Sequence, residues 1–310
     1  MANGSFIQVL DIGTELGRLD EIQGGRWVVK VFPTCGEASV TWSRLPLTDD
    51  SREAAKAGRE AKAAVMSRVP QPVQETSEER SVRRARAEVR RYGLHNRLDQ
   101  MVTFTFAGDP PPFDSLGEVV HNFWKRFYRR AEREGLSPGQ RFPYVWVPEW
   151  GKVSRRLHLH MAVSWWDALG CVEVCQGCAR DALKAVRKDL PPVGSFCVGC
   201  VWGHGFVGRP ESNQDGRSLS KYLTKYLTKD LAGSEVKKGG QRYHCGEGQR
   251  PASARVEADS AYEGVLHALS VVRAIVGAED VPPVMFAPAS DSEWSGPPVV
   301  ILDFKQIGTY

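Results

Sequence analysis

The sequence predicts an α+β protein in which an antiparallel sheet carries helices on one face. Residues 101–106, "MVTFTF", alternate polar and apolar side chains as a half-buried strand does. Residues 116–131 repeat apolar side chains at helical spacing, with arginines on the other side. Residues 144–163 contain two strand-like runs around Gly151, which is typical of an antiparallel hairpin.

Composition restricts the class of protein. The chain has 310 residues, 42% hydrophobic and 25% charged, enough for one large domain or two ordinary ones. It shows no signal peptide and no apolar stretch long enough to cross a membrane, so we expect a cytoplasmic protein. The net charge is only +4, but arginines cluster in residues 79–97 and 124–133. These clusters suit either a polyanion or an ordinary solvated helix surface.

We expect three regions along the chain. Residues 1–75 hold short strands, a polar helix over 49–68 and a linker. Thr76 and Glu79 form a capping box that opens the second region, 76–250. In residues 251–310 a capped helix precedes the strand-like "PPVVILDF", and this region either completes the core or docks on it.

The second run of the hairpin, "RLHLHMAV", carries two histidines. Side chains alternate along a strand, so His158 and His160 share one face, about 7 Å apart, and the apolar residues share the other. We therefore expect an apolar core face and an open histidine face. Glu149, just before the turn, falls roughly opposite His158. These three ligands suit Mg²⁺ or Mn²⁺, with zinc also possible, although a histidine pair on a strand is also common surface decoration.

Five of the seven cysteines lie in residues 171–200. Cys175 and Cys178 form one CxxC pair and Cys197 and Cys200 another, and Cys171 is a possible substitute in the first pair. Two such pairs, eighteen residues apart, predict a structural zinc ion held by four thiolates. A redox pair or scattered buried cysteines would be the alternatives.

The segment "SLSKYLTKYLTKD" places Tyr222 and Tyr226 four residues apart, with Lys225 and Lys229 alongside. On a helix both phenol oxygens would lie on one face, about 6 Å apart. The same spacing also fits a buried stripe of an amphipathic helix. The segment alone does not decide between a packing repeat and a pair of nucleophiles.

Taken in order, "VTFTF", "VPEW", "RLHLHMAV", "VWGHGFV" and "YLTKYLTK" resemble the HUH endonucleases, more narrowly the two-tyrosine rolling-circle replication initiators of single-stranded DNA phages and small bacterial plasmids. The resemblance covers about residues 100 to 230. It implies a ferredoxin-like or RRM-like fold, here with residues 170–201 as an inserted zinc-ribbon-like module.

The resemblance also implies a mechanism. Glu149, His158 and His160 would hold the catalytic Mg²⁺ or Mn²⁺ ion. Tyr222 or Tyr226 would attack the scissile phosphate, giving a 5′-phosphotyrosine link and a free 3′-hydroxyl primer, and the second tyrosine would later cut the regenerated origin. Lys225 would neutralise the phosphate or assist the phenol. Which tyrosine attacks first stays open.

The implied partners are single-stranded and duplex origin DNA, with a host helicase and polymerase in the bacterial cytoplasm. Two other readings remain. A relaxase or transposase would use the same histidines and tyrosines in another order. A non-catalytic zinc-ribbon DNA-binding regulator would need the cysteines and arginines but neither His158 nor Tyr226.

Overall fold

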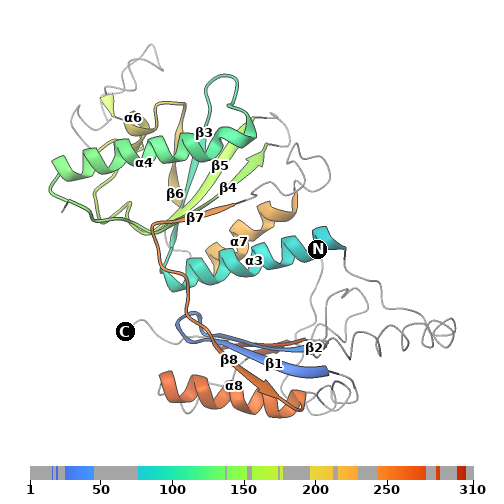
Figure 1. Cartoon of the computed structure of the whole chain (residues 1–310). Helices are drawn as coiled ribbons and strands as arrows, with labels where there is room; N and C mark the ends of the chain where they lie inside the picture. Colours follow the sequence, from blue (N-terminus) through green and yellow to red (C-terminus); the bar gives the residue numbers. More distant parts are fainter. Residues whose placement is uncertain are drawn as a thin grey trace. The chain divides into compact units, whose positions relative to one another are not determined.

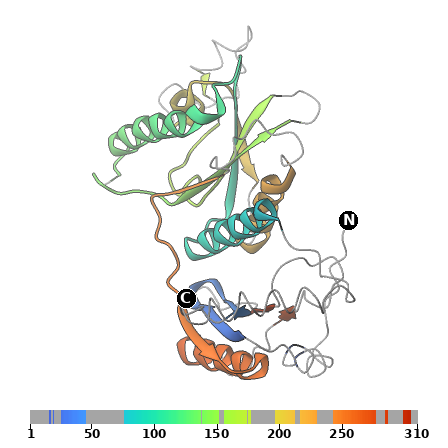
Figure 2. The ribbon, with the colours of Figure 1, turned by 45° about the vertical axis from the view of Figure 1, so that its right-hand side comes forward.

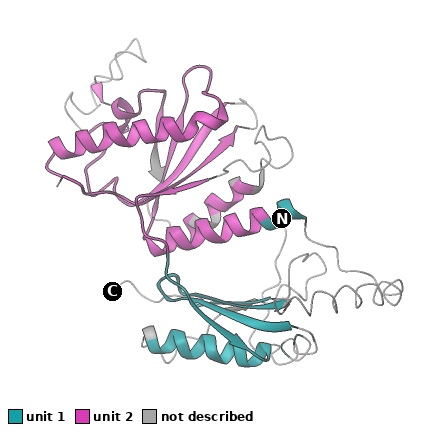
Figure 3. Cartoon of the chain, in the orientation of Figure 1, with its two compact units in different colours: residues 1–80, 251–310 teal, residues 81–250 magenta. Residues whose placement is uncertain are grey.

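The computed structural model forms two compact units, residues 1–80 with 251–310 and residues 81–250 (Figures 1 and 3). Each unit contains one five-stranded sheet. The structure describes residues 16, 19, 25–44, 76–136, 138–151, 156–173, 175, 176, 196–211, 216–229, 243–276, 284–286 and 299–304. The polar helix expected at residues 49–68 lies outside this set.

The sheet of the first unit joins strands from both ends of the chain. Its order is β8-β1-β2-β10-β9, and every pair is antiparallel. The strands are β1 Gly25–Phe32, β2 Glu37–Arg44, β8 Ala254–Ala258, β9 Val284–Phe286 and β10 Val299–Asp303. The C-terminal region therefore builds its sheet with the N-terminal strands, because β1 pairs with β8 and β2 with β10.

Helix α8, Ala261–Val276, covers one face of this sheet. Its start is capped as predicted: the Glu263 N–H donates to the Ser260 hydroxyl at 3.0 Å. Apolar side chains on one side of the helix, Ala261, Val265, Ala268 and Val272, join the buried residues of β1, β2 and β10. Gly264 allows a close approach, since a Cβ there would collide with Val40.

The second unit contains a five-stranded antiparallel sheet of order β6-β3-β5-β4-β7. Its strands are β3 Gln100–Thr105, β4 Tyr144–Trp150, β5 Leu157–Val163, β6 Val207–Glu211 and β7 His244–Gly246. Its helices are α3 Ser77–His95, α4 Leu116–Arg133, α6 Val198–Trp202 and α7 Gly216–Lys229. The predicted hairpin is confirmed as β4 and β5, which places β5 at the centre of the sheet.

The capping box predicted before α3 is confirmed. The Thr76 N–H donates to the Glu79 carboxylate at 2.7 Å, and the Glu79 N–H donates to the Thr76 hydroxyl at 3.1 Å. These two bonds satisfy backbone donors that the first turn of a helix leaves without partners. The same helix is tied to the segment after β7, because the Tyr92 hydroxyl donates to the Gly246 carbonyl at 2.7 Å.

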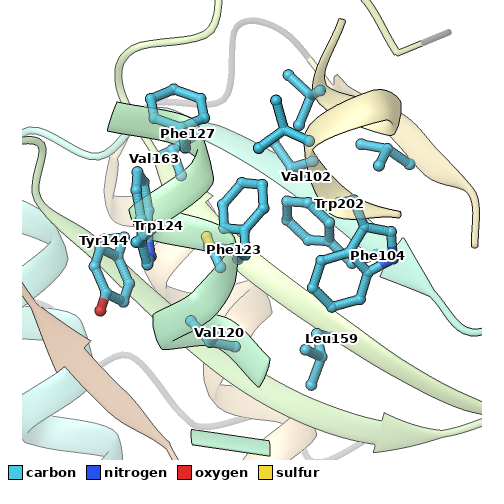
Figure 4. Close-up of a cluster of buried hydrophobic side chains, with 14 of the residues drawn as sticks. Val102, Phe104, Val120, Phe123, Trp124, Phe127, Tyr144, Leu159, Val163 and Trp202 are labelled. Carbon is cyan, nitrogen blue, oxygen red and sulfur yellow. The ribbon is translucent and has the colours of Figure 1, made fainter. Parts of the chain in front are cut away.

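Helix α4 packs on the first face of this sheet and builds an aromatic core (Figure 4). Phe123 of α4 contacts Phe104 of β3 and Trp202 of α6, with ring centroids 5.2 and 5.9 Å apart. Leu157, Leu159, Met161 and Val163 of β5 belong to the same cluster, as their alternation predicts. The apolar face of β5 is therefore confirmed as core.

Helices α3 and α7 pack on the opposite face, which is the face of His158 and His160 (Figures 1 and 2). The expectation of helices on one face only, with an open histidine face, is therefore wrong. The physical reason is that this face is apolar over much of its area: it carries Met101, Val145, Val147 and Ala162, which pack against leucines of α7. An apolar half-sheet needs a cover. Both layers make the unit α+β, as predicted for the class.

Among the residues that the structure describes, none of the helices combines the length and the apolar character needed to cross a membrane.

Candidate functional site

The β4–β5 hairpin gathers the three predicted metal ligands on one face of the sheet. Glu149 pairs with His158, and Val147 pairs with His160. The position of Glu149 opposite His158 is the one that the hairpin predicts. Because directly paired residues in an antiparallel sheet point to the same side, the carboxylate and both imidazoles project together.

His160 is the most constrained of the three. Its Nε2 lies 2.8 Å from the Glu149 Oε2, and its Nδ1 lies 3.2 Å from the Thr103 hydroxyl oxygen. An ionised carboxylate can only accept, so a neutral His160 carries its proton on Nε2 and accepts the Thr103 hydroxyl proton at Nδ1. The ring is buried and held from both sides.

His158 lies beside this pair. Its ring is nearly parallel to that of His160, with an interplanar angle of 12° and centroids 6.5 Å apart. On β3 its cross-strand partner is Thr105, next along the face from Thr103. The contact to Glu149 is therefore made by His160, diagonally across the hairpin, and His158 stands next to the contact without closing on it.

The tyrosine helix α7 lies on this same face. Leu219, Leu223 and Leu227 form its buried stripe against β3, β4 and β5. Leucines therefore carry the packing, and Tyr222 sits at the edge of the stripe, only partly buried. The Lys225 ammonium lies 5.3 Å from the centroid of the Tyr222 ring, within the range of a cation–π contact. The side chain of Tyr226 lies outside the described part of the structure.

The cysteines gather at a second place in the unit. The sulfur atoms of Cys175, Cys197 and Cys200 all lie within 4.8 Å of one another, and those of Cys175 and Cys200 are 3.6 Å apart. Within the described residues this is the one group of three or more His, Cys, Asp or Glu side chains that converges so closely. Cys178 lies outside the described residues. Cys171 belongs to the aromatic core instead, where burial raises the pKa of its thiol to about 12.

Backbone contacts bring the two cysteine segments together. Val172 and Cys197 form an isolated parallel bridge, and the Gly199 N–H donates to the Glu173 carbonyl at 3.1 Å. A Cβ at Gly199 would collide with that carbonyl, so the position needs glycine. The short helix α6 starts at the next residue after Cys197 and ends at Trp202, whose indole N–H donates to the Thr105 carbonyl at 2.9 Å. The cysteine cluster is thus tied to the end of β3.

Sequence reasoning missed two residues of the histidine face. Thr103 was noted only as part of the alternation of its strand, yet its hydroxyl contacts His160. Phe206 stands next to β6 and hydrogen bonds through its backbone to Thr105. Both were visible in the sequence as members of "VTFTF" and "VWGHGFV". Neither could be assigned to the site without knowing which strands flank β5.

Comparison with known proteins places the similarity among replication-associated proteins. Residues 99–231 match the model of a family described as replication-associated protein ORF2. The matched range runs from just before β3 to the end of α7 and contains the histidine face and the cysteine cluster. This match supports a replication initiator. No curated protein and no solved structure matches the chain.

Proposed function

We propose that this protein is a replication initiator that nicks origin DNA through a tyrosine nucleophile and later rejoins the displaced strand. One observation carries the proposal: α7, with its two tyrosines, packs on the face of the sheet that bears Glu149, His158 and His160. A nucleophile and a candidate metal site thus share one surface. The match to replication-associated proteins supports the same reading.

The donor set fits a divalent ion. Glu149 and His160 already direct an oxygen and a nitrogen at each other, 2.8 Å apart, and His158 lies on the same face. One carboxylate and two imidazoles would hold Mg²⁺ or Mn²⁺ and leave positions for phosphate oxygens. When bound, such an ion supplies Lewis-acid polarisation of the scissile phosphate. Thr103 holds the His160 ring in the orientation that ligation needs.

The bond changes follow from the residues of α7. The phenol oxygen of Tyr222 or Tyr226 attacks phosphorus and forms the O–P bond while the P–O3′ bond breaks. The phenol loses its proton and the departing O3′ gains one, which leaves a 5′-phosphotyrosine and a 3′-hydroxyl primer. Lys225 would offset the negative charge of the phosphate. The second tyrosine would cut the regenerated origin and allow the strand to be rejoined.

The test is formation of a covalent adduct. The protein is mixed with Mn²⁺ and single-stranded oligonucleotides that tile its own replicon, and products are separated on a denaturing gel. We expect a protein–DNA band that EDTA abolishes. The double variant Tyr222→Phe/Tyr226→Phe should give none, whereas Tyr262→Phe, at an exposed tyrosine of α8, should react like the parent protein.

An adduct that persists in the double variant would contradict the proposal. DNA binding with no adduct on any oligonucleotide would favour the other candidate, a DNA-binding regulator.

The cysteine cluster supports a separate proposal, a structural zinc ion. Three sulfur atoms within 4.8 Å of one another form the soft donor set that zinc prefers, and thiolate ligation at this spacing is typical of structural sites. Cys178, the fourth ligand expected from the sequence, would complete a tetrahedral set. Because α6 follows Cys197 directly and reaches β3 through Trp202, the ion would stabilise the entry to β6.

A further inference from the structure

Phe206 is exposed where a phenylalanine would be expected to be buried. Its relative exposure is 60%, and the other exposed large hydrophobic residues among those described, Val256, Tyr262 and Leu266, all belong to the first unit. In the described part of the second unit Phe206 is thus a single exposed aromatic ring. Protein–protein contact surfaces need a contiguous apolar patch, whereas a platform for a nucleic-acid base needs only one ring.

The backbone of Phe206 is held firmly in place. Its N–H donates to the Thr105 hydroxyl at 3.0 Å, and its carbonyl accepts from the Thr105 N–H at 2.9 Å. Gly205 permits this close approach, because a Cβ there would collide with the Thr105 carbonyl. That same carbonyl accepts the indole N–H of the fully buried Trp202. The ring therefore projects from a rigid point, which limits the entropy lost when a ligand stacks on it.

The direction of the ring follows from its neighbour. Val207 is buried in the aromatic core beneath α4. Because successive side chains of an extended strand point to opposite faces, Phe206 projects to the face of the histidines. Its partner Thr105 pairs with His158, and His158 pairs with Glu149. One row across the sheet thus reads Glu149, His158, Thr105 and Phe206.

The spacing of this row suits one nucleotide. Phe206 lies two strand spacings from His158, about 10 Å. That length is comparable with the reach from a phosphate to the base of the adjoining nucleotide. Gly208, which pairs with Thr103 in the next row, places no side chain beside the ring.

We propose that Phe206 stacks on a base of single-stranded DNA next to the scissile phosphate and so positions that phosphate over the histidine face. This inference rests on the proposed nicking function for the identity of the phosphate. The stacking itself needs no metal and no cleavage, so it can be measured separately.

The first experiment measures binding of fluorescein-labelled dT12 by anisotropy in EDTA, where no cleavage occurs. Base–aromatic stacking predicts that Phe206→Ala weakens binding by about 5- to 150-fold. Phe206→Trp should restore it, because a larger ring stacks at least as well. Tyr262→Ala is the matched control, since it removes an exposed aromatic from α8, and it should bind like the parent protein. Equal affinity of Phe206→Ala and the parent protein would overturn the proposal.

The second experiment uses the unaltered protein, so it does not depend on the folding of a variant. A dT12 strand containing 5-bromodeoxyuridine is photo-crosslinked to the protein, and the modified peptide is sequenced. We expect the crosslink at Phe206; a crosslink confined to residues of the first unit would contradict the inference. Failure of the proposed function looks different: the crosslink and the loss of binding would remain, but no covalent tyrosine adduct would form on any oligonucleotide.

Discussion

Thr103 connects the sheet to the chemistry of the site. Its hydroxyl lies 3.2 Å from the His160 Nδ1, while Glu149 takes the other ring nitrogen. A histidine held at one nitrogen has a fixed tautomer and ring orientation, so its other nitrogen is presented for ligation. We therefore consider Thr103 a positioning residue that acts through His160.

Replacing Thr103 tests this role. Thr103→Val keeps the shape and β-branching but removes the hydroxyl, and loss of such a supporting contact typically costs about 10- to 100-fold in metal affinity or activity. We expect weaker Mn²⁺ binding by electron paramagnetic resonance and adduct formation slowed by about the same factor. Circular dichroism should be unchanged.

Thr103→Ser is the control, because it retains the hydroxyl and should recover most of the Mn²⁺ affinity. A Thr103→Val variant that binds Mn²⁺ as tightly as the parent protein would show that the contact has only a packing role.

At this scale the sequence predicted what local pairing determines. The position of Glu149 opposite His158 follows from a hairpin closed near Gly151, and the structure confirms it. Thr103 could not be placed in the same way. Its contact with His160 depends on β3 lying beside β5, a pairing between segments more than 50 residues apart, which no short pattern in the sequence encodes.

Among the elements, the cysteine segments show how a small region can be held without a large core of its own. The contacts between Val172 and Cys197 and between Glu173 and Gly199 bring two short strands of chain together, and the sulfur atoms meet beside them. A metal ion bound there would contribute its binding free energy to folding.

The expected zinc content follows from this arrangement. Cys197→Ser removes one ligand, and we expect bound zinc to fall from about one ion per chain to near none, as measured by plasma mass spectrometry. Thermal unfolding should also begin at a lower temperature, since the binding free energy is lost. Cys245→Ser is the matched control, because Cys245 lies at β7, outside the cluster. Zinc retained in Cys197→Ser at the level of the control would argue against the site.

The elements themselves were largely predictable, and their layering was not. Both helix caps, the hairpin and the helix over residues 116–131 are confirmed, because each depends on neighbours a few residues apart. The error concerned the histidine face. Val145 and Val147 already indicated that β4 is apolar on both sides, the pattern of a strand covered by two layers. Attention to the two histidines hid that signal.

The whole molecule divides so that every described residue of both candidate sites falls in the second unit. The first unit joins residues 1–80 with 251–310, a grouping that depends on the pairing of Trp27 with Ala258. Composition cannot reveal a pairing of that separation along the chain. The sequence suggested a boundary near residue 75 and left open how the C-terminal region attaches.

Dissection of the chain tests the autonomy of the second unit. A protein of residues 76–250 keeps the capping box of α3, the five strands and both core layers. We expect it to unfold cooperatively by circular dichroism and to form the same covalent adduct as the full chain.

A chain of residues 1–250 provides the comparison. It lacks β8, β9 and β10, so β1 and β2 become an isolated two-stranded hairpin, which is marginally stable in water. Limited proteolysis should then cut within residues 1–75 and spare 81–250. An unfolded 76–250 protein would show that the second unit depends on the first.

The discontinuous first unit also sets an order of events on the ribosome. About 210 residues separate the end of β2 from the start of β8, so at ordinary rates of translation ~10–40 s pass between the synthesis of these two strands. During that interval both edges of the β1–β2 hairpin await their partners, while all the strands of the second unit's sheet have already emerged. The nascent chain thus completes its candidate DNA-processing half before the half that contains both of its ends.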